Sequence, residues 1–542
     1  MATTTIAAKE GQDAAQPAPY YTVVRKTTQV DRMFYIYHRL GIQANVLVAA
    51  RYGSAQSGDL DLSDETVYAA LHAVVTKCPE LGLVGVTEPT EEGKHFLTLA
   101  ALNSINLESC VEFVDENVPS MGAEYFEQLH SQWLWADGEV RPGQPWWKVI
   151  ILGRKHVVFL FHHLVCDGSF GMTFHREFLA SLNAAAASSM RQRAPREVHV
   201  NPERVRLNER IKIAVRRKPP VFGIIYNFLM FVFFRYFYSK RLFFTDFAKP
   251  RPYLNDAMGS ALPQERTVTK VYNYRIPAQK MDAILAACRS NGTTFTPLLT
   301  VLITATLAAD QYPKAKVGFT RYAVDMRPVG NFEDLAAGQG KMLSLAASVP
   351  EPQKLKKYRK AMPTMLSRDG IQQARAYLNP KLTWGLVRDY GRRMQKLRKG
   401  GEKSPVYKSW LSGNSMGPTL EEFTEKSLPS LGTIMQNSFS ISNLGALKTT
   451  SVASGGTEPA VRIEDVQFST ASPHGGVGYH GIVFNVAGMA GGDTVINACT
   501  EEAMAPAGLA RSVLEGVMAR IDALLLVQST ASEKERRARS NV

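Results

Sequence analysis

One stretch of the chain, residues 147–182, constrains the fold more than any other. Trp147 to Leu152 and His156 to Phe161 read as two strands, because each is a short apolar run and the turn Gly153-Arg154-Lys155 separates them. The second strand leads into the loop His162-His163-Leu164-Val165-Cys166-Asp167-Gly168, and a helix is expected from Ser169 onward. This stretch therefore predicts a strand pair that presents two histidines at its end, just before a helix.

The rest of the chain mixes strands and helices in two comparable halves, which indicates an α/β (α+β) fold. A chain of 542 residues is too long for one ordinary core, so two large domains or two fused half-domains are expected. Further strands are predicted at 272–276, 317–323, 481–487 and 494–499, and helices at 64–78, 280–291, 295–309 and 509–527. The predicted parts are a flexible lead at 1–20, a first half-domain at 21–200, an apolar and basic connecting segment at 201–261, a second half-domain at 262–528 and a disordered tail at 529–542.

The composition is that of a globular protein with an anionic partner. Hydrophobic residues make up 45% of the chain and charged residues 21%, which is ordinary. The formal net charge of +14 suggests a nucleic acid, a membrane surface or a phosphorylated small molecule as partner. No zinc-finger or RNP-type motif accompanies the basic residues, so nucleic acid is the least favoured of the three. Most of the basic runs also fit solvated helix faces.

The cysteines and the N-terminal residues indicate in which cellular compartment the protein is expected. The five cysteines are odd in number, widely spaced and form no CxxC pair, so neither a disulfide framework nor a metal site is expected. Residues 1–19 are rich in Ala, Thr and Gln and lack the apolar core of a secretory signal. These features favour a reduced, cytoplasmic location.

The histidine loop carries the chemistry. A histidine at a strand end can expose one ring nitrogen, and its ordinary pKa near neutrality suits proton abstraction, so His163 is the candidate catalytic base. Asp167, four residues on, is placed either to orient the ring or to brace the loop, and Gly168 lets the chain double back. His162 is expected to pack on the opposite side of the strand from His163. The alternative is a pair of satisfied, partly buried histidines beside an ordinary Asp-Gly turn.

These residues resemble the chloramphenicol acetyltransferase-like superfamily, which includes BAHD acyltransferases, condensation domains and polyketide-associated acyltransferases. The chain is most similar to the fungal-type alcohol acetyltransferases. HHxxxDG is the specific motif, and weaker similarities occur in the expected order over most of the chain. They lie in residues 25–41, 71–81, 145–147, 288–299, 324–327 and 441–445. The DFGWG motif of the plant BAHD branch is absent, so plant-type substrates are not implied.

The resemblance implies two α/β half-domains with mixed sheets and a tunnel at their interface, reached by CoA from one mouth and by the acceptor from the other. It implies that Asp167 is structural and pairs with an arginine of the second half, for which Arg327 is the candidate. Ser442 and Asn443 match the strand that lines the tunnel and are tentative groups for the substrate or the oxyanion, although an ordinary turn also explains them. No bound cofactor is implied, and acetyl-CoA or another acyl-CoA is the cosubstrate.

The function expected from these residues is a CoA-dependent O-acyltransferase, an O-acetyltransferase in particular. It would act on a hydroxyl of a small lipophilic or specialised-metabolite alcohol, with His163 as general base. The alternatives are carrier-protein-dependent condensation and a catalytically silent, membrane-associated binding protein. Cys166 is a disfavoured nucleophile because it occupies a variable position of the motif. His175 is expected to be structural, His474 and His480 have no assigned role, and a monomer is assumed.

The apolar segment 221–238 suggests a membrane contact. Residues 221–234 are nearly all apolar, and basic residues flank them on both sides. The run is shorter than the roughly 20 residues of a spanning helix, which leaves a buried helix, a helix lying in the bilayer interface or a re-entrant hairpin. Peripheral contact with the endoplasmic reticulum or a lipid-droplet surface is an expectation from this segment.

Overall fold

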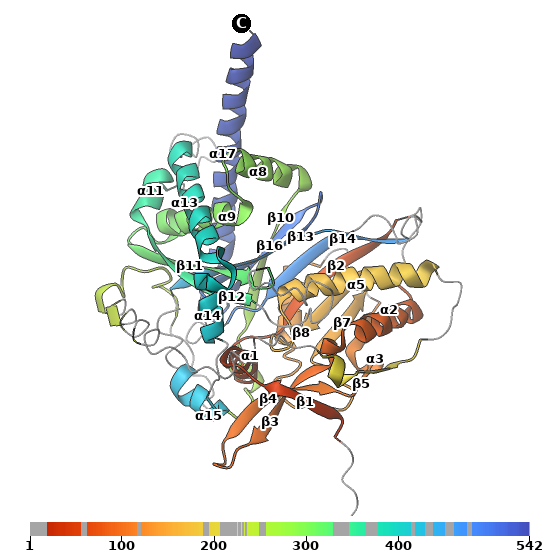
Figure 1. Cartoon of the computed structure of the whole chain (residues 1–542). Helices are drawn as coiled ribbons and strands as arrows, with labels where there is room; N and C mark the ends of the chain where they lie inside the picture. The colour runs from red at the N-terminus through yellow and green to blue at the C-terminus, as the bar shows by residue number, and fades with distance from the viewer. Residues whose placement is uncertain are drawn as a thin grey trace, which may run out of the picture.

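A computed structural model of the whole chain provides the architecture (Figure 1). It describes residues 19–55, 62–115, 121–187, 194–205, 236–248, 256–328, 346–364, 378–413, 418–428, 437–449, 460–473 and 480–540, together with residues 225, 229, 232 and 233. Most of the connecting segment 201–261 and His474 therefore lie outside the described residues. The mixed α/β fold predicted from the sequence is confirmed.

The histidine loop belongs to a mixed five-stranded sheet whose order is β14-β2-β8-β7-β6. Its strands are β14 (Val461–Thr470), β2 (Val46–Ser54), β8 (His156–Phe161), β7 (Trp147–Leu152) and β6 (Val111–Val114). Strand β8 pairs antiparallel with β2 and with β7, whereas β7 and β6 run parallel. The bounds predicted for β7 and β8 match those observed.

Strand β8 is buried on both faces, which explains why its sequence is continuously apolar instead of alternating. Val157, Phe159 and Phe161 face the core under helices α2 (Asp64–Lys77) and α5 (Gly168–Ala187). The Phe159 ring stacks on Phe174 of α5, with ring centroids 4.0 Å apart. Val158 and Leu160 face a second core that includes helix α4 (Ala123–Ser131) and residues of the other large sheet.

The second large sheet has the order β10-β16-β15-β13-β11-β12. Its strands are β10 (Thr269–Ile276), β16 (Thr494–Glu501), β15 (Ile482–Met489), β13 (Ser438–Leu447), β11 (Val317–Asp325) and β12 (Ala346–Lys354). Strand β13 runs parallel to both β11 and β15, so this sheet is also mixed. Helix α9 (Phe295–Thr306) is buried except at Thr296, which is partly exposed. It packs with α8 (Ala278–Ser290), α13 (Pro380–Arg398) and α17 (Leu509–Ser540) (Figure 1).

The position of strand β14 differs from the predicted division of the chain into two half-domains. It lies within the predicted second half-domain at 262–528, yet it pairs antiparallel with β2 and completes the first half's sheet. The side chain of Gln467 on β14 donates to the Met121 carbonyl at 3.2 Å, and Ser469 contacts His130 of α4 at 2.8 Å. The two halves therefore share a strand, because the edge of the first sheet needs a partner that the first 200 residues do not supply.

The remaining elements complete the layers. Strands β1 (Tyr21–Lys26), β4 (His95–Leu102) and β3 (Leu83–Pro89) form an antiparallel sheet, and β5 (Ser104–Asn106) pairs with β9 (Glu197–His199). Among the described residues, the other α-helices are α1 (Gln29–Arg39), α3 (Leu107–Cys110), α11 (Lys356–Ala361), α14 (Pro405–Gly413) and α15 (Leu420–Glu422). The 3₁₀ turns are η1 (Pro79–Gly82), η2 (Pro202–Arg204), η3 (Pro263–Glu265) and η5 (Gly401–Lys403), and π turns occur at η4 (Leu307–Gln311) and η6 (Phe423–Ser427).

The C-terminal region also differs from the prediction, because it is helical where a disordered tail was expected. Residues 529–540, predicted as part of a disordered tail, continue helix α17 to Ser540, which rises from the body of the protein in Figure 1. The Ala, Glu, Lys and Arg residues of this stretch favour helix, although their charge suggested disorder. In the described residues no single helix has both the length and the apolar character to cross a membrane. The pair formed by α8 and Phe295–Gln311, bent by 97°, meets both criteria.

Candidate active site

Asp167 begins helix α5 and thereby shapes the end of the histidine loop. Its Oδ1 accepts the backbone N–H of Phe170 at 3.0 Å, which is the capping bond that a helix N-terminus needs. Its carbonyl accepts the N–H of Gly171 at 3.1 Å and starts the helical ladder. The loop is therefore held between the end of β8 and the first turn of α5.

The Asp167 carboxylate also forms a bidentate ion pair with Arg327, which follows strand β11 of the second half. Nη1 of Arg327 donates to Oδ2 at 3.1 Å and Nη2 donates to Oδ1 at 3.2 Å, while Nη1 also donates to Asp325 at 3.0 Å. Burial lowers the pKa of Arg327, but Asp167 and Asp325 outweigh this and raise it. The expected pair between Asp167 and Arg327 is present, and it links the two halves next to the loop.

The ring of His163 is stacked against one aromatic side chain. Its imidazole stacks on the ring of Phe34 of helix α1, with centroids 3.8 Å apart and planes 12° apart. Burial lowers the pKa of His163, whereas nearby backbone groups and the charge of Asp167 oppose this shift. Nδ1 is buried and makes no hydrogen bond of ordinary geometry with the described residues. The ring is therefore neutral at pH 7, and its residue remains partly exposed.

His162 lies buried among aromatic rings. It is buried, and its ring lies 4.6 Å from that of His38 and 4.9 Å from that of Trp146. Its Nδ1 accepts the N–H of Leu164 at 3.0 Å, and burial lowers its pKa well below the ordinary value, so it stays neutral. The expectation that the two histidines lie on opposite sides was too simple. Strand β8 ends at Phe161, and both rings meet α1, where Phe34 and His38 are one turn apart.

Cys166 does not have the environment of a nucleophile. It is fully buried, and burial raises the pKa of its thiol well above the ordinary value, with Asp167 adding to the effect. All five cysteines lie in the described part of the chain, and they are buried and free of disulfides. Among the described residues no group of three or more His, Cys, Asp or Glu side chains could hold a metal ion.

Gly168 sits where strands from the second half meet the loop. A Cβ added at this position would lie 2.8 Å from the ring of Phe468 on β14 and 2.9 Å from Leu444 on β13. The glycine is therefore needed for close approach of three segments that are far apart in the sequence. Because Leu444 follows Asn443 directly, this contact also brings the Ser442-Asn443 segment to the N-terminus of α5.

Asn443 is fixed by two hydrogen bonds. Its Nδ2 donates to the hydroxyl of Thr296 at 3.0 Å, and its Oδ1 accepts the N–H of Gly445 at 2.8 Å. The pairing of β13 with β15 shifts register between Asn443 and Ala446, so the strand bulges here. Ser442, one residue earlier, is in register with Asn485 of β15. Both residues are partly exposed.

His175 is buried in the core and held by two hydrogen bonds. The buried ring contacts the Tyr52 hydroxyl through Nδ1 at 3.0 Å and the Val48 carbonyl through Nε2 at 3.1 Å. Because Nε2 must donate to the carbonyl, Nδ1 accepts from Tyr52 and the ring is neutral. Burial accordingly lowers the pKa of His175 to about 4.

Sequence reasoning missed Phe34, Thr296 and Phe468, which contact His163, Asn443 and Gly168. Phe34 belongs to residues 25–41, which the family resemblance marked only weakly. No local pattern distinguishes Thr296 or Phe468 from other residues of a buried helix or strand. Contact with the loop arises only when distant segments pack together.

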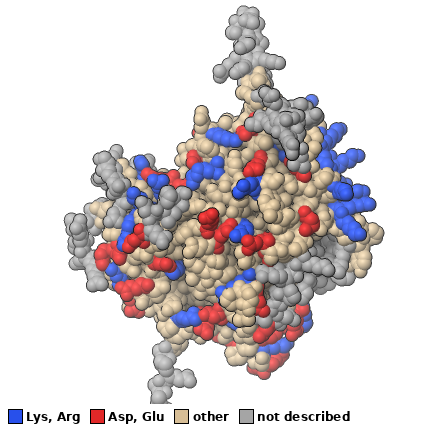
Figure 2. Space-filling view, turned by 180° about the vertical axis from the view of Figure 1, so that it is seen from behind, with Lys and Arg blue, Asp and Glu red and all other residues tan. Residues whose placement is uncertain are grey.

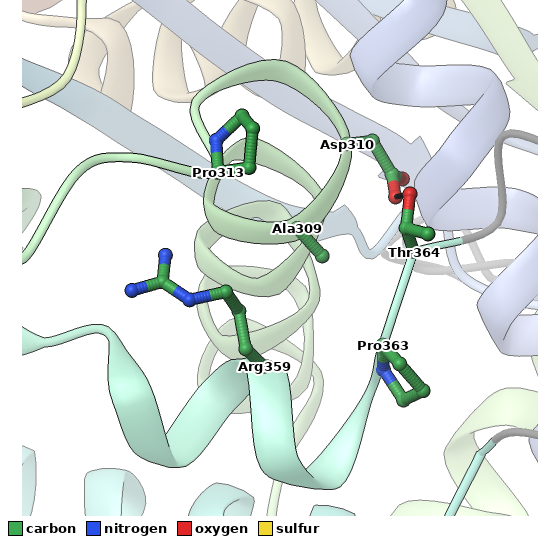
Figure 3. Close-up of a pocket in the computed structure, with 6 residues that line it drawn as sticks. All are labelled: Ala309, Asp310, Pro313, Arg359, Pro363 and Thr364. Atoms are coloured by element: carbon green, nitrogen blue, oxygen red, sulfur yellow. Dashed lines mark hydrogen bonds between the residues drawn. The ribbon is translucent and has the colours of Figure 1, made fainter.

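A pocket on the second half does not contain these residues. It has a volume of about 400 Å³ and is lined by Ala309, Asp310, Pro313, Arg359, Pro363 and Thr364 (Figure 3). Arg359 donates to the carbonyls of Ala308 and Ala315, and the Thr364 hydroxyl donates to Asp310 at 3.1 Å. The polar groups of this pocket are thus engaged within the protein, and none of them belongs to the predicted site.

One comparison with known protein families covers the loop and its ion pair. Residues 121–328 match the alcohol acetyltransferase family. This segment holds His163, Asp167 and Arg327, but not Ser442 or Asn443. The probable alcohol acetyltransferase crmB of Aspergillus fumigatus is 30% identical over 170 residues, which are 28% of this chain and 35% of that protein. The alcohol acetyltransferase match thus spans about a third of the length of this relative.

Two solved structures share the fold over nearly the whole length of this chain. The TRI3 trichothecene 15-O-acetyltransferase of Fusarium sporotrichioides superposes with a TM-score of 0.62 and 11% identity, over 94% of this chain and 97% of that one. VibH, an NRPS condensation enzyme, gives a TM-score of 0.50 and 12% identity over 93% and 96% of the two chains. At these identities the likeness shows the chloramphenicol acetyltransferase-like fold alone.

Proposed function

We propose that this protein is a CoA-dependent O-acyltransferase that moves an acyl group, an acetyl group in particular, to a hydroxyl of a small lipophilic alcohol. The observation that supports this most directly is the state of His163. Its ring is neutral and stacked on Phe34, and the residue as a whole is partly exposed after the end of β8. A neutral imidazole that is fixed in orientation is what a general base requires.

The reaction proceeds by direct transfer between two bound substrates. The unprotonated ring nitrogen of His163 accepts the proton of the acceptor hydroxyl while the oxygen attacks the thioester carbonyl. The tetrahedral oxyanion collapses, the carbon–sulfur bond breaks, and the CoA thiolate leaves. His163 then returns the proton to the thiolate, which gives free CoA thiol and neutral His163. General-base catalysis of this kind contributes roughly 10² to 10⁴-fold to the rate. No covalent enzyme intermediate is required.

Asn443 is the candidate donor to the oxyanion. One N–H of its amide is used by Thr296, and the other donates to no described residue. The hydrogen bonds to Thr296 and Gly445 hold the amide in place before substrate binds, which is the condition for a strong oxyanion interaction. Ser442 is assigned to the substrate side of the same strand.

The experiment measures CoA-thiol release by the full chain with acetyl-CoA and a panel of small and lipophilic alcohols, with the ester confirmed by mass. Wild type and Cys166→Ala should both release thiol in an alcohol-dependent manner, and His163→Ala should not. Equal loss in Cys166→Ala and His163→Ala, with both variants folded, would support a cysteine nucleophile instead. Activity with carrier-bound acyl donors but not with acetyl-CoA would favour condensation chemistry.

A further inference from the structure

An apolar stripe remains on the surface where the connecting segment is described. Residues 225, 229, 233 and 237 are each helical, and the rings of Phe233 and Phe237 lie together with centroids 5.5 Å apart. Each side chain of the stripe is between 45 and 75% exposed. Its members are Ile225, Leu229, Phe233, Tyr236 and Phe237. Folded proteins rarely leave a contiguous row of large apolar groups in water unless it binds something.

The stripe is held in a defined place by the residues that follow it. Arg241 donates its N–H to the Tyr238 carbonyl at 2.8 Å and closes a turn after the stripe. Phe243 and Phe244 then enter the core, where their rings lie 5.9 and 5.5 Å from that of Tyr312. The exposed stripe is therefore anchored to the second half and is not a free chain end.

Basic residues from three segments gather at this anchor. The Arg241 carbonyl accepts the N–H of Lys316 at 2.7 Å, and the Lys316 carbonyl accepts the N–H of Leu355 at 3.0 Å. These two bonds join residues 240–241, 314–316 and 354–356 side by side. We call their exposed cations the basic rim: Lys240, Arg241, Lys314, Lys316, Lys354 and Lys356.

The basic rim carries positive charge that the described residues do not neutralise. No carboxylate among them lies within ion-pair distance of a rim residue, although the nearby Asp310 and Glu351 pair with Arg520 and Arg393. Figure 2 shows Lys and Arg side chains gathered along one edge of the molecule. The apolar stripe and the basic rim together are complementary to a surface that has an apolar interior and anionic groups at its boundary with water.

We infer that the apolar stripe and the basic rim form a docking surface for an anionic phospholipid membrane. The stripe would enter the boundary between headgroups and acyl chains, as the apolar face of an interfacial helix does. The rim would meet the negative headgroups, to which each Lys or Arg adds roughly fivefold in affinity. Two of the five stripe residues, Ile225 and Leu229, are aliphatic and cannot stack on bases, so they favour a lipid surface over a nucleic acid.

The test is binding of the full chain to vesicles of equimolar phosphatidylcholine and phosphatidylserine, compared with phosphatidylcholine alone, by sedimentation. Wild type should bind the mixed vesicles more tightly, and added salt should weaken the binding. The rim variant Lys314→Glu/Lys316→Glu should lose at least about twentyfold in affinity, since two cations are replaced by anions. The stripe variant Tyr236→Ser/Phe237→Ser should also lose at least about tenfold, because buried apolar area drives insertion.

A matched control carries the same charge change elsewhere. Lys26→Glu/Arg204→Glu alters two exposed basic residues on β1 and η2 and should bind like wild type. His163→Ala should bind normally, so the docking result does not depend on the proposed acyl transfer. Absence of vesicle binding, equal losses in rim and control variants, or selective binding of RNA through the rim would each overturn the inference.

Discussion

Both carboxylate oxygens of Asp167 accept hydrogen bonds from Arg327, and one of them also accepts the N–H of Phe170. A carboxylate engaged in this way is not available to orient the ring of His163. Of the two roles open to this aspartate, bracing the loop is the one supported by its contacts. It acts on His163 through its charge, which opposes the fall in pKa caused by burial.

The first prediction concerns Asp167→Asn, which keeps the side-chain shape but removes its charge. Breaking a buried pair typically costs about 3–5 kcal/mol of folding free energy, and the loss here should be at or below this range because Arg327 keeps Asp325. Urea unfolding should show this loss, while the folded variant keeps measurable activity. A variant as stable as wild type yet as inactive as His163→Ala would assign Asp167 a chemical role.

The pH dependence follows from the same charge. Activity needs neutral His163, so kcat/KM should be constant near pH 7 and should fall only as the pH drops below the ordinary pKa of 6.5. We call this fall in kcat/KM at low pH the acid limb. Because the Asp167 charge raises the pKa of His163, Asp167→Asn should move the acid limb to lower pH. An acid limb centred above pH 6.5 in wild type would contradict the burial of the ring.

Gly168→Ala tests the close approach of the two halves. The new Cβ would meet Phe468 and Leu444 at under 3 Å, and overpacking of this kind costs about 1–3 kcal/mol. Gly385→Ala is the control, since Gly385 lies within α13 and a Cβ there has nothing within 4 Å. It should stabilise the protein by up to about 1 kcal/mol. Equal unfolding midpoints for the two variants would show that the packing at Gly168 is loose.

Phe34→Leu should separate positioning of His163 from its chemistry. Leucine keeps the site apolar but cannot stack on the imidazole, so kcat should fall by about ten- to a hundredfold with little change in KM for acetyl-CoA. The acid limb should move toward pH 6.5 as water reaches the ring. Phe178→Leu, on the buried face of α5, is the control and should lower stability without shifting the acid limb.

The buried histidines make stability depend on pH. His175 has a folded-state pKa of about 4 and an unfolded value near 6.5, so below pH 6.5 only the unfolded chain takes up the proton. Its contribution is complete above pH 6.5 and should decline by about 2 kcal/mol at pH 5. His175→Gln should reduce the difference in unfolding free energy between pH 7.5 and pH 5. An unchanged difference would mean that the ring is already protonated in the fold.

Local sequence pattern by itself determines much of the site. The apolar runs at 147–152 and 156–161 are strands with the predicted ends, and the loop between β8 and α5 carries His163 and Asp167 where expected. These features depend on residues close in sequence, where apolar runs, turns and capping groups act directly on the backbone. Arg327 as partner of Asp167 came from family resemblance, since no local pattern connects residues 160 positions apart.

Tertiary structure decided what surrounds the loop. Phe34 and His38 of α1 contact the rings of His163 and His162. Thr296 of α9 accepts a hydrogen bond from Asn443. Phe468 lies next to Gly168 on β14, a strand of the second half that pairs with the first sheet. Each of these residues would look like ordinary core or helix surface in its own segment. Their roles come from non-local packing, in which strand pairing and burial select partners that neither periodicity nor propensity records.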